Sequence, residues 1–206
     1  MSKFKTEQEE FWATEFGNDY IDRNKSQNYL ASNINFFSNA LKQCRNIDSI
    51  IEFGANIGMN LKAIGLLFPE MTLKGIEINP TAASQLENVI GKENVINDSI
   101  MNYESDIKND VSLIKGVLIH INPDELNLVY EKLYNASKKY ILIAEYYNPS
   151  PVTIPYRGHS DRLFKRDFAG EMLTKYSDLT LVDYGFVYKR DPLFPQDDIT
   201  WFLLKK

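Results

Sequence analysis

The sequence predicts an α/β domain with a mostly parallel sheet, and three observations support this. Short apolar and β-branched runs alternate with amphipathic helical segments along most of the 206 residues, as in sheets with crossover helices. Ile50–Asn60 combines a buried strand, a glycine turn and a helix start. A second apolar run leads to Glu77, 23 positions after Gly54, close to the roughly 20-residue offset at which Rossmann-type sites hold a ribose.

The chain has the length of one well-cored domain and is short for two. We expect an N-terminal helical cap over residues 1–46 and a Rossmann-like core over 47–206, with no repeat or linker between them. The two cap helices are predicted at Glu7–Tyr20 and Ser26–Cys44.

The core is predicted to alternate strands with helices, which implies right-handed crossovers. The strand candidates are Ser49–Phe53, Leu73–Ile78, Asn94–Asn97, Val111–Lys115 and Lys139–Ala144. The helix candidates are Ile57–Leu67, Pro80–Val89 and Pro123–Ala136. The chain ends differently, with the strand candidates Leu179–Tyr188 and Ile199–Leu204 joined as a hairpin, which predicts an antiparallel edge.

The glycine turn indicates which adenosine-bearing cofactor is expected. Gly54 and Gly58 allow a tight turn and close approach of a ligand. Asn56 replaces the middle glycine of a dinucleotide motif, and its side chain would crowd a pyrophosphate. Glu52 would repel a pyrophosphate but could receive an ammonium group. The turn therefore favours S-adenosylmethionine over NAD, although a glycine turn can also exist for packing alone.

The ends of the third and fourth strands carry further candidates. Asp98 could accept a hydrogen bond from an adenine amino group, with Ser99 beside it, or could simply cap a turn. Gly116 allows close backbone approach after the fourth strand. His120 precedes a helix start at Asn122-Pro123 and is a candidate proton acceptor, although a lone histidine in a loop is often structural.

An aromatic and basic region follows the fifth strand. Tyr146, Tyr147 and Asn148 lie at the expected substrate mouth. The stretch Tyr156–Asp167 carries a local positive charge in a chain of net charge −5, which indicates an anion-binding surface. Its alternative is a solvated helix face. The predicted catalytic residues are His120, His159 and Tyr146, and the predicted substrate-binding residues are Tyr147, Asn148, Tyr156, Arg157, Arg162 and Arg166.

Composition narrows the class of protein. The acidic balance, with a net charge of −5, argues against a nucleic-acid partner. The single cysteine, Cys44, fits a reducing compartment. A charged beginning without a signal-type apolar run, and no stretch long enough to span a bilayer, predict a cytoplasmic protein without a membrane partner. No metal-ligand spacing is present, so no metal is expected.

Together these motifs resemble class I S-adenosylmethionine-dependent methyltransferases, and within them the pseudaminic-acid-biosynthesis-associated methylase family. The class-level likeness rests on Glu52–Gly58, Glu77, Asp98 and Lys115–Ile121. The family-level likeness rests on Phe11-Trp12, Phe16–Asn24, Glu145–Pro149, Tyr156–Asp167 and Pro195–Trp201, and covers nearly the whole chain.

The resemblance implies a seven-stranded sheet whose last strand is antiparallel, with helices on both faces. It also implies methionine-end contacts at the glycine turn, ribose contact at Glu77, adenine contact at Asp98 and Ser99, and a cover formed by Tyr20, Arg23 and Asn24. The cofactor-binding set expected from motifs and resemblance is Tyr20, Asn24, Glu52, Gly54, Asn56, Gly58, Glu77, Ile78, Asp98, Ser99 and Lys115.

The resulting hypothesis is a methyltransferase acting on an oxygen or nitrogen of a small, anionic, sugar-related substrate. Two alternatives stay open: a non-catalytic S-adenosylmethionine-binding partner protein, and an NAD-dependent nucleotide-sugar enzyme. The sequence does not indicate the acceptor, the methylated atom or the oligomeric state.

Overall fold

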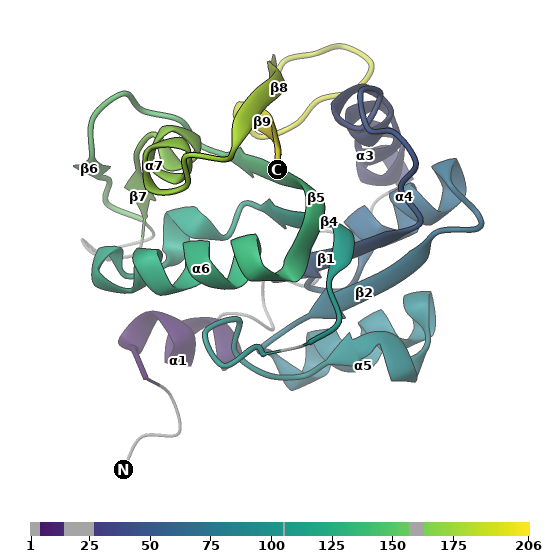
Figure 1. Cartoon of the computed structure of the whole chain (residues 1–206). Helices are drawn as coiled ribbons and strands as arrows, with labels where there is room; N and C mark the ends of the chain where they lie inside the picture. The colour runs from purple at the N-terminus through teal and green to yellow at the C-terminus, as the bar shows by residue number, and fades with distance from the viewer. Residues whose placement is uncertain (1–4, 15–26, 105, 157–162) are drawn as a thin grey trace.

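The computed structural model describes residues 5–14, 27–104, 106–156 and 163–206. These residues form a seven-stranded sheet in the order β3-β2-β1-β4-β5-β9-β8 (Figure 1). Its strands are β1 Ser49–Phe53, β2 Thr72–Ile76, β3 Val95–Ile96, β4 Asn109–Lys115, β5 Ser137–Glu145, β8 Thr180–Val187 and β9 Ile199–Lys205. The α-helices are α1 Glu7–Ala13, α3 Gln27–Ala40, α4 Met59–Leu67, α5 Pro80–Ile90, α6 Leu126–Ala136 and α7 Phe168–Lys175.

The topology confirms the predicted sheet. The strands β1 to β5 pair in parallel, and β9 pairs antiparallel with both β5 and β8. The predicted antiparallel addition at the end of the chain is confirmed, with β9 between β5 and β8 and with β8 at the edge. The turn from β8 to β9 therefore lies at the carboxyl end of β5, where Thr200 is paired with Glu145.

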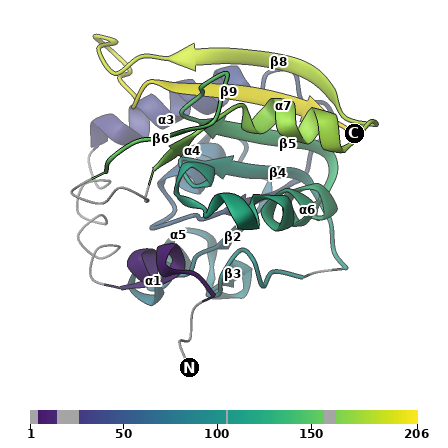
Figure 2. The ribbon, with the colours of Figure 1, turned by 90° about the vertical axis from the view of Figure 1, so that its left-hand side faces the viewer.

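Two apolar layers hold the helices against the sheet. Successive side chains of a strand point to opposite faces, so Ile50 and Leu113 pack with α3 and α4, while Ile51 and Ile114 pack with α6 and α7. Figure 2 shows α6 and α7 in front of the sheet and α3 behind it. Both faces of the central strands are thus covered, and all seven residues of β4 are buried, as expected for parallel strands.

The boundaries of several elements differ from the prediction. α1 ends at Ala13, so the predicted continuation to Tyr20 runs into residues outside the described ranges. α3 ends at Ala40 and passes into a turn in which the Cys44 amide donates to the Leu41 carbonyl, rather than continuing to Cys44. The helix predicted from Pro123 begins as the 3-10 turn η4 Pro123–Glu125, where the Asn122 side chain caps the backbone amide of Asp124.

Three elements in the region after the fifth strand were not predicted from the sequence. β6 Val152–Thr153 and β7 Phe164–Lys165 form a small antiparallel ladder, and α7 follows it. The signal for α7 was present, because Asp167 caps the helix by accepting from the Gly170 amide. The basic stretch Tyr156–Asp167 was interpreted as an anion-binding surface, so the helix that begins after Asp167 was not predicted.

Among the described helices, none has both the length and the apolar character needed to cross a bilayer.

Leu142 gives a test of the core. Its side chain is fully buried in β5, so Leu142→Ala should lower the free energy of unfolding by about 2–5 kcal/mol, because it removes packed methyl groups and leaves a cavity. The control Leu181→Ala, on the exposed edge strand at 47% exposure, should change it by less than about 0.5 kcal/mol. Denaturant titration measures both, and equal losses would contradict the assignment of Leu142 to the core.

Candidate functional site

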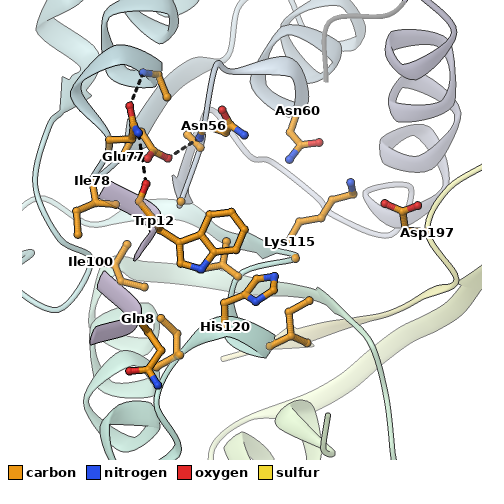
Figure 3. A pocket seen from close by; sticks show the side chains of 18 of the residues that line it. Gln8, Trp12, Asn56, Asn60, Glu77, Ile78, Ile100, Lys115, His120 and Asp197 are labelled. Atoms are coloured by element: carbon orange, nitrogen blue, oxygen red, sulfur yellow. Dashed lines mark hydrogen bonds between the residues drawn. The ribbon is translucent and has the colours of Figure 1, made fainter. Parts of the chain in front are cut away.

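A cavity of about 650 Å³ lies at the carboxyl ends of the parallel strands. Its wall is built by residues that follow β1, β2, β3, β4 and β5, by α1, and by the segment between β8 and β9. Figure 3 shows labelled side chains from α1, from the ends of β1 to β4 and the residues after them, and from the segment between β8 and β9 around one space. In an open α/β sheet this is the position where ligands bind.

The turn after β1 forms the floor of the cavity. Gly54, Asn56 and Gly58 all have left-handed backbone, with φ of +77°, +49° and +83°. A Cβ at Gly54 would lie 2.6 Å from the Val117 side chain, and one at Gly58 would lie 2.6 Å from Leu86. Glycine is therefore required at both positions by conformation and by packing, and asparagine is the residue that tolerates this conformation at Asn56.

Glu77 follows β2 and faces the cavity (Figure 3). One carboxylate oxygen accepts from the Asn56 amide at 2.7 Å and the other from the Asn79 amide at 2.8 Å. Burial raises the pKa of Glu77, while these backbone hydrogen bonds lower it. Because a carboxylate oxygen can accept more than one hydrogen bond, Glu77 can still receive hydroxyl groups from a ligand.

Glu52 lies behind the cavity wall and acts through Asn60. Glu52 is fully buried, and its Oε1 accepts from Asn60 Nδ2 at 2.6 Å. Burial raises the pKa of the Glu52 carboxyl to about 8, while the Asn60 hydrogen bond and the Lys115 charge lower it. This contact holds the Asn60 amide nitrogen, so its oxygen is the atom left for a ligand.

Three buried oxygens near the glycine turn lack hydrogen-bond partners in the described structure: Glu52 Oε2, Asn56 Oδ1 and Asn60 Oδ1. Asn56 and Asn60 both line the cavity. Buried polar atoms are nearly always paired in native proteins, so these oxygens indicate a ligand that brings hydrogen-bond donors to this end of the cavity.

Lys115 provides a buried positive charge at the end of β4. Its ammonium group lies 5.5 Å from the ring centre of Tyr29 and 5.6 Å from that of Phe36, and it donates to the Tyr29 hydroxyl at 3.4 Å. No carboxylate of the described residues forms a salt bridge with it, although it lines the cavity. A buried cation with this environment can receive a ligand carboxylate.

His120 lies between two aromatic rings. Its ring centre is 4.6 Å from that of Trp12 and 5.3 Å from that of Tyr156, and all three side chains line the cavity. The loop that carries His120 is held by Glu145, which accepts from the amides of Val117 and Leu118 at 2.9 Å each. Burial raises the pKa of Glu145 to about 7, against these hydrogen bonds.

The helix α1 closes one side of the cavity. Its Thr6–Glu9 capping box satisfies the first backbone amides of the helix. The Ser99 hydroxyl donates to the Glu9 carboxylate, and the Asn79 side chain donates to the Trp12 carbonyl at 3.3 Å. These contacts bring Gln8, Glu9 and Trp12 to the wall formed by Ser99 and Ile100.

Most of the predicted site residues that lie within the described ranges line this cavity. They are Gly54, Asn56, Glu77, Ile78, Ser99, Lys115, His120, Tyr146 and Tyr156. Gly58 shapes the floor without lining it, and Glu52 contributes through Asn60. Tyr146 is half-buried beneath the Lys165 ammonium group at 4.9 Å from its ring centre, and burial raises its pKa.

Four predicted contacts do not reach the cavity. Asp98 is exposed and caps the following turn, accepting from Ser99 N and Asn102 Nδ2, so the capping alternative describes it. Arg166 pairs with Glu171 at 2.5 Å. Tyr147 packs near Phe202, with ring centres 6.0 Å apart, and is 42% exposed. Asn148 donates to the Ser150 carbonyl at the surface.

Tyr20, Arg23, Asn24, Arg157, His159 and Arg162 lie outside the described residues, so their predicted roles stay predictions.

Several lining residues escaped the sequence analysis, among them Gln8, Trp12, Tyr29, Asn60, Gln196 and Asp197. Asn60 had a local signal, since it follows the glycine turn by two residues. Gln196 stood in the Pro195–Trp201 string of the family resemblance, but no role was assigned to it, because its place in the cavity depends on the position of β9 in the sheet. Within the described part of the chain, no group of three or more His, Cys, Asp or Glu side chains is arranged to hold a metal.

The similarity of this chain to known proteins lies in its structure. No family model and no curated protein matches this sequence. A Burkholderia thailandensis 1,6-didemethyltoxoflavin-N1-methyltransferase, solved with S-adenosylhomocysteine, superimposes with a TM-score of 0.70 and 13% identity, covering 100% of this chain and 93% of that one. A Leishmania major S-adenosylmethionine-dependent methyltransferase gives a TM-score of 0.70 and 15% identity, covering 97% and 81%.

A third similar structure is the magnesium protoporphyrin IX methyltransferase of Synechocystis with bound S-adenosylmethionine, at a TM-score of 0.68 and 9% identity over 100% of both chains. The chain has the fold of class I S-adenosylmethionine-dependent methyltransferases. None of these comparisons bears on the resemblance to the pseudaminic-acid methylase family.

The raised pKa of Glu52 predicts a pH effect on stability. Its pKa in the folded protein is about 8, against about 4.5 for an ordinary Glu, so the folded state holds a proton that the unfolded state has lost. The Glu52 contribution should therefore lower the free energy of unfolding as pH rises from about 4.5 to about 8, by at most about 1.4 kcal/mol per pH unit.

Glu52→Gln should remove this contribution, because Gln does not ionise and can still accept from Asn60. Urea titrations between pH 5 and 8 give the free energy of unfolding of wild type and variant at each pH. The difference between the two proteins isolates the Glu52 contribution, because the pH dependence that Glu145 contributes is common to both. Parallel pH profiles for wild type and variant would contradict the assigned burial of Glu52.

Proposed function

We propose that this chain is an S-adenosylmethionine-dependent methyltransferase that acts on a small molecule. The observation that carries the proposal is the pair of unpartnered side-chain oxygens of Asn56 and Asn60 beside the glycine turn, with the Glu77 carboxylate in the same cavity. Acceptor oxygens at one end suit an ammonium group, and a carboxylate after β2 suits ribose hydroxyls.

The cavity residues fit the parts of this cofactor. Asn60 and Asn56 would accept from the ammonium group of the methionine portion, and Lys115 would pair with its carboxylate. Glu77 would receive the ribose hydroxyls. Ile78, Ser99 and Ile100, with Gln8 from α1, would surround the adenine. Tyr20 and Asn24 are proposed from the sequence as further contacts.

The same features disfavour NAD. A pyrophosphate needs backbone amides and no competing acceptors at the glycine turn. Here the Asn56 amide already donates to Glu77 at 2.7 Å, and carboxamide oxygens without partners among the described residues lie nearby. Two phosphate charges placed there would face oxygen atoms, so this alternative has less support.

The proposed chemistry needs little from the protein beyond alignment and a proton acceptor. Bound S-adenosylmethionine would supply a methyl group that the sulfonium has already activated. Gly116 has a φ of +67°, and among the described residues other than its chain neighbours no atom lies within 4 Å of the position a Cβ would take, so an acceptor can approach the backbone there. His120 would accept the proton of the attacking hydroxyl or amine, with its ring orientation fixed by Trp12 and Tyr156.

We propose that the acceptor is anionic and sugar-related and is methylated on oxygen or nitrogen. The support is the sequence resemblance to the pseudaminic-acid methylase family and the basic stretch after β6. Arg157 and Arg162 are the proposed anion contacts and His159 an alternative proton acceptor, while Tyr146 and Tyr156 would form the wall beside the acceptor.

Calorimetry and product analysis test the proposed function. S-adenosylmethionine should bind the purified protein and NAD should not. Incubation of S-adenosylmethionine labelled in the methyl group with sugar-acid pools should give a labelled product by mass spectrometry. Cofactor binding without transfer to any pool would support a non-catalytic S-adenosylmethionine-binding protein instead, and NAD binding alone would overturn the assignment.

Asn60 allows a sharper test of cofactor orientation. S-adenosylhomocysteine carries the amino-acid portion, and 5′-methylthioadenosine lacks it. Asn60→Leu should weaken S-adenosylhomocysteine binding by about tenfold or more, because a hydrogen bond to a charged group is lost. Binding of 5′-methylthioadenosine should stay within about twofold.

The matched control is Asn88→Leu, the same change on an exposed position of α5, which should alter neither affinity. Equal weakening of both ligands by Asn60→Leu would show a general effect on the pocket rather than a contact with the amino-acid portion.

His120→Gln should lower the rate of methyl transfer by about a hundredfold or more if His120 takes the proton. The affinity for S-adenosylhomocysteine should be unchanged. A variant that retains the wild-type rate would remove His120 from this role.

A further inference from the structure

The segment between β8 and β9 places a buried polar side chain in the cavity wall. Gln196 lines the cavity and is 5% exposed. Its Nε2 donates to Asn33 Oδ1 on α3 at 2.9 Å. Its Oε1 is buried and has no hydrogen-bond partner among the described residues. Leaving a buried acceptor unpaired is unfavourable, so a ligand that donates a hydrogen bond at this point would offset that cost.

The position of Gln196 is fixed by its surroundings. Asn33 is fully buried in α3 and orients the amide. The backbone amide of Gln196 donates to the Tyr188 carbonyl at 3.3 Å. Lys189 closes the base of the segment through Asp198, which accepts from the Lys189 amide at 3.0 Å and pairs with its ammonium group at 3.2 Å. Asn33 thus orients the Gln196 side chain, while the other contacts fix the backbone of the segment that carries it.

The sheet order assigns Gln196 to the end of the cavity opposite the adenine wall. Ser99 follows β3 and Glu77 follows β2, whereas Gln196 directly precedes β9 on the far side of β4 and β5. The proposed cofactor spans the ends of β3, β2, β1 and β4. The remaining space, over β5 and β9, is therefore left for the acceptor, and Tyr146 and Ile199 also line it.

We propose that Gln196 is an acceptor-recognition residue whose side-chain oxygen accepts a hydrogen bond from a hydroxyl or N–H group of the substrate. Asp197 at the mouth of the cavity supplies a second acceptor; in Figure 3 it lies on the side toward which Lys115 extends. Two neighbouring acceptors favour a substrate with adjacent donors, the pattern of a hydroxyl-rich sugar ring. A flat ring without donors would leave Gln196 unpaired. This inference rests on the proposed function.

A matched pair of probes tests the inference. D-glucuronate and cyclohexanecarboxylate share a six-membered ring and a carboxylate, but only the first has hydroxyl donors on the ring. Titration into the protein saturated with S-adenosylhomocysteine, followed by NMR, should show glucuronate binding at least about tenfold more tightly. Gln196→Leu should remove most of this preference while S-adenosylhomocysteine affinity stays within about twofold.

Leu193→Ala is the control, because Leu193 lies in the same segment and is 74% exposed; it should keep the preference. Thermal unfolding of each variant shows whether the fold persists. Equal binding of the two probes, no binding of either, or an unchanged preference in Gln196→Leu would each overturn the inference. Failure of wild-type protein to bind S-adenosylhomocysteine would instead overturn the proposed function, so the two failures are distinguishable.

Discussion

The Glu77 carboxylate joins the two turns on which the cavity depends. It accepts from the backbone after β1 at Asn56 and from the start of α5 at Asn79. Each hydrogen bond satisfies a backbone amide that has no strand partner. Together the two bonds hold the left-handed turn after β1 beside the loop between β2 and α5. Burying a carboxylate is costly unless it is hydrogen-bonded, and the two amides meet that requirement. The cavity floor is thus built around one acidic side chain.

The alternation of strands and helices along the chain, and several residues at the carboxyl ends of the strands, could be predicted from the sequence, because both follow from local patterns. The glycine turn needs Gly54 and Gly58 for backbone reasons that hold in any context. Glu77 follows from its distance along the chain, since a βαβ unit has a nearly constant length. These residues line or shape the cavity as expected.

The rest could not be predicted, because it depends on contacts between distant segments. Asp98 has the right position to reach adenine, yet its carboxylate is used by the Asn102 side chain and the Ser99 amide. Arg166 lies in a basic stretch, yet its guanidinium group forms a salt bridge with Glu171 on α7. Trp12 and Gln196 reach the cavity only through the packing of α1 and the insertion of β9. Sequence patterns record local preference, and such partners are chosen in three dimensions.

The insertion of β9 has a consequence for how the last two strands are attached to the sheet. β8 precedes β9 in the chain, but its neighbour in the large sheet is β9, which in turn pairs with β5. The edge strand therefore joins the sheet only through β9, and the pairing of β9 with β5 spans more than 50 residues of sequence. The wall carrying Gln196 depends on this long-range pairing. Local opening of the β5–β9 ladder would therefore release that wall while leaving the half of the sheet around Glu77 intact.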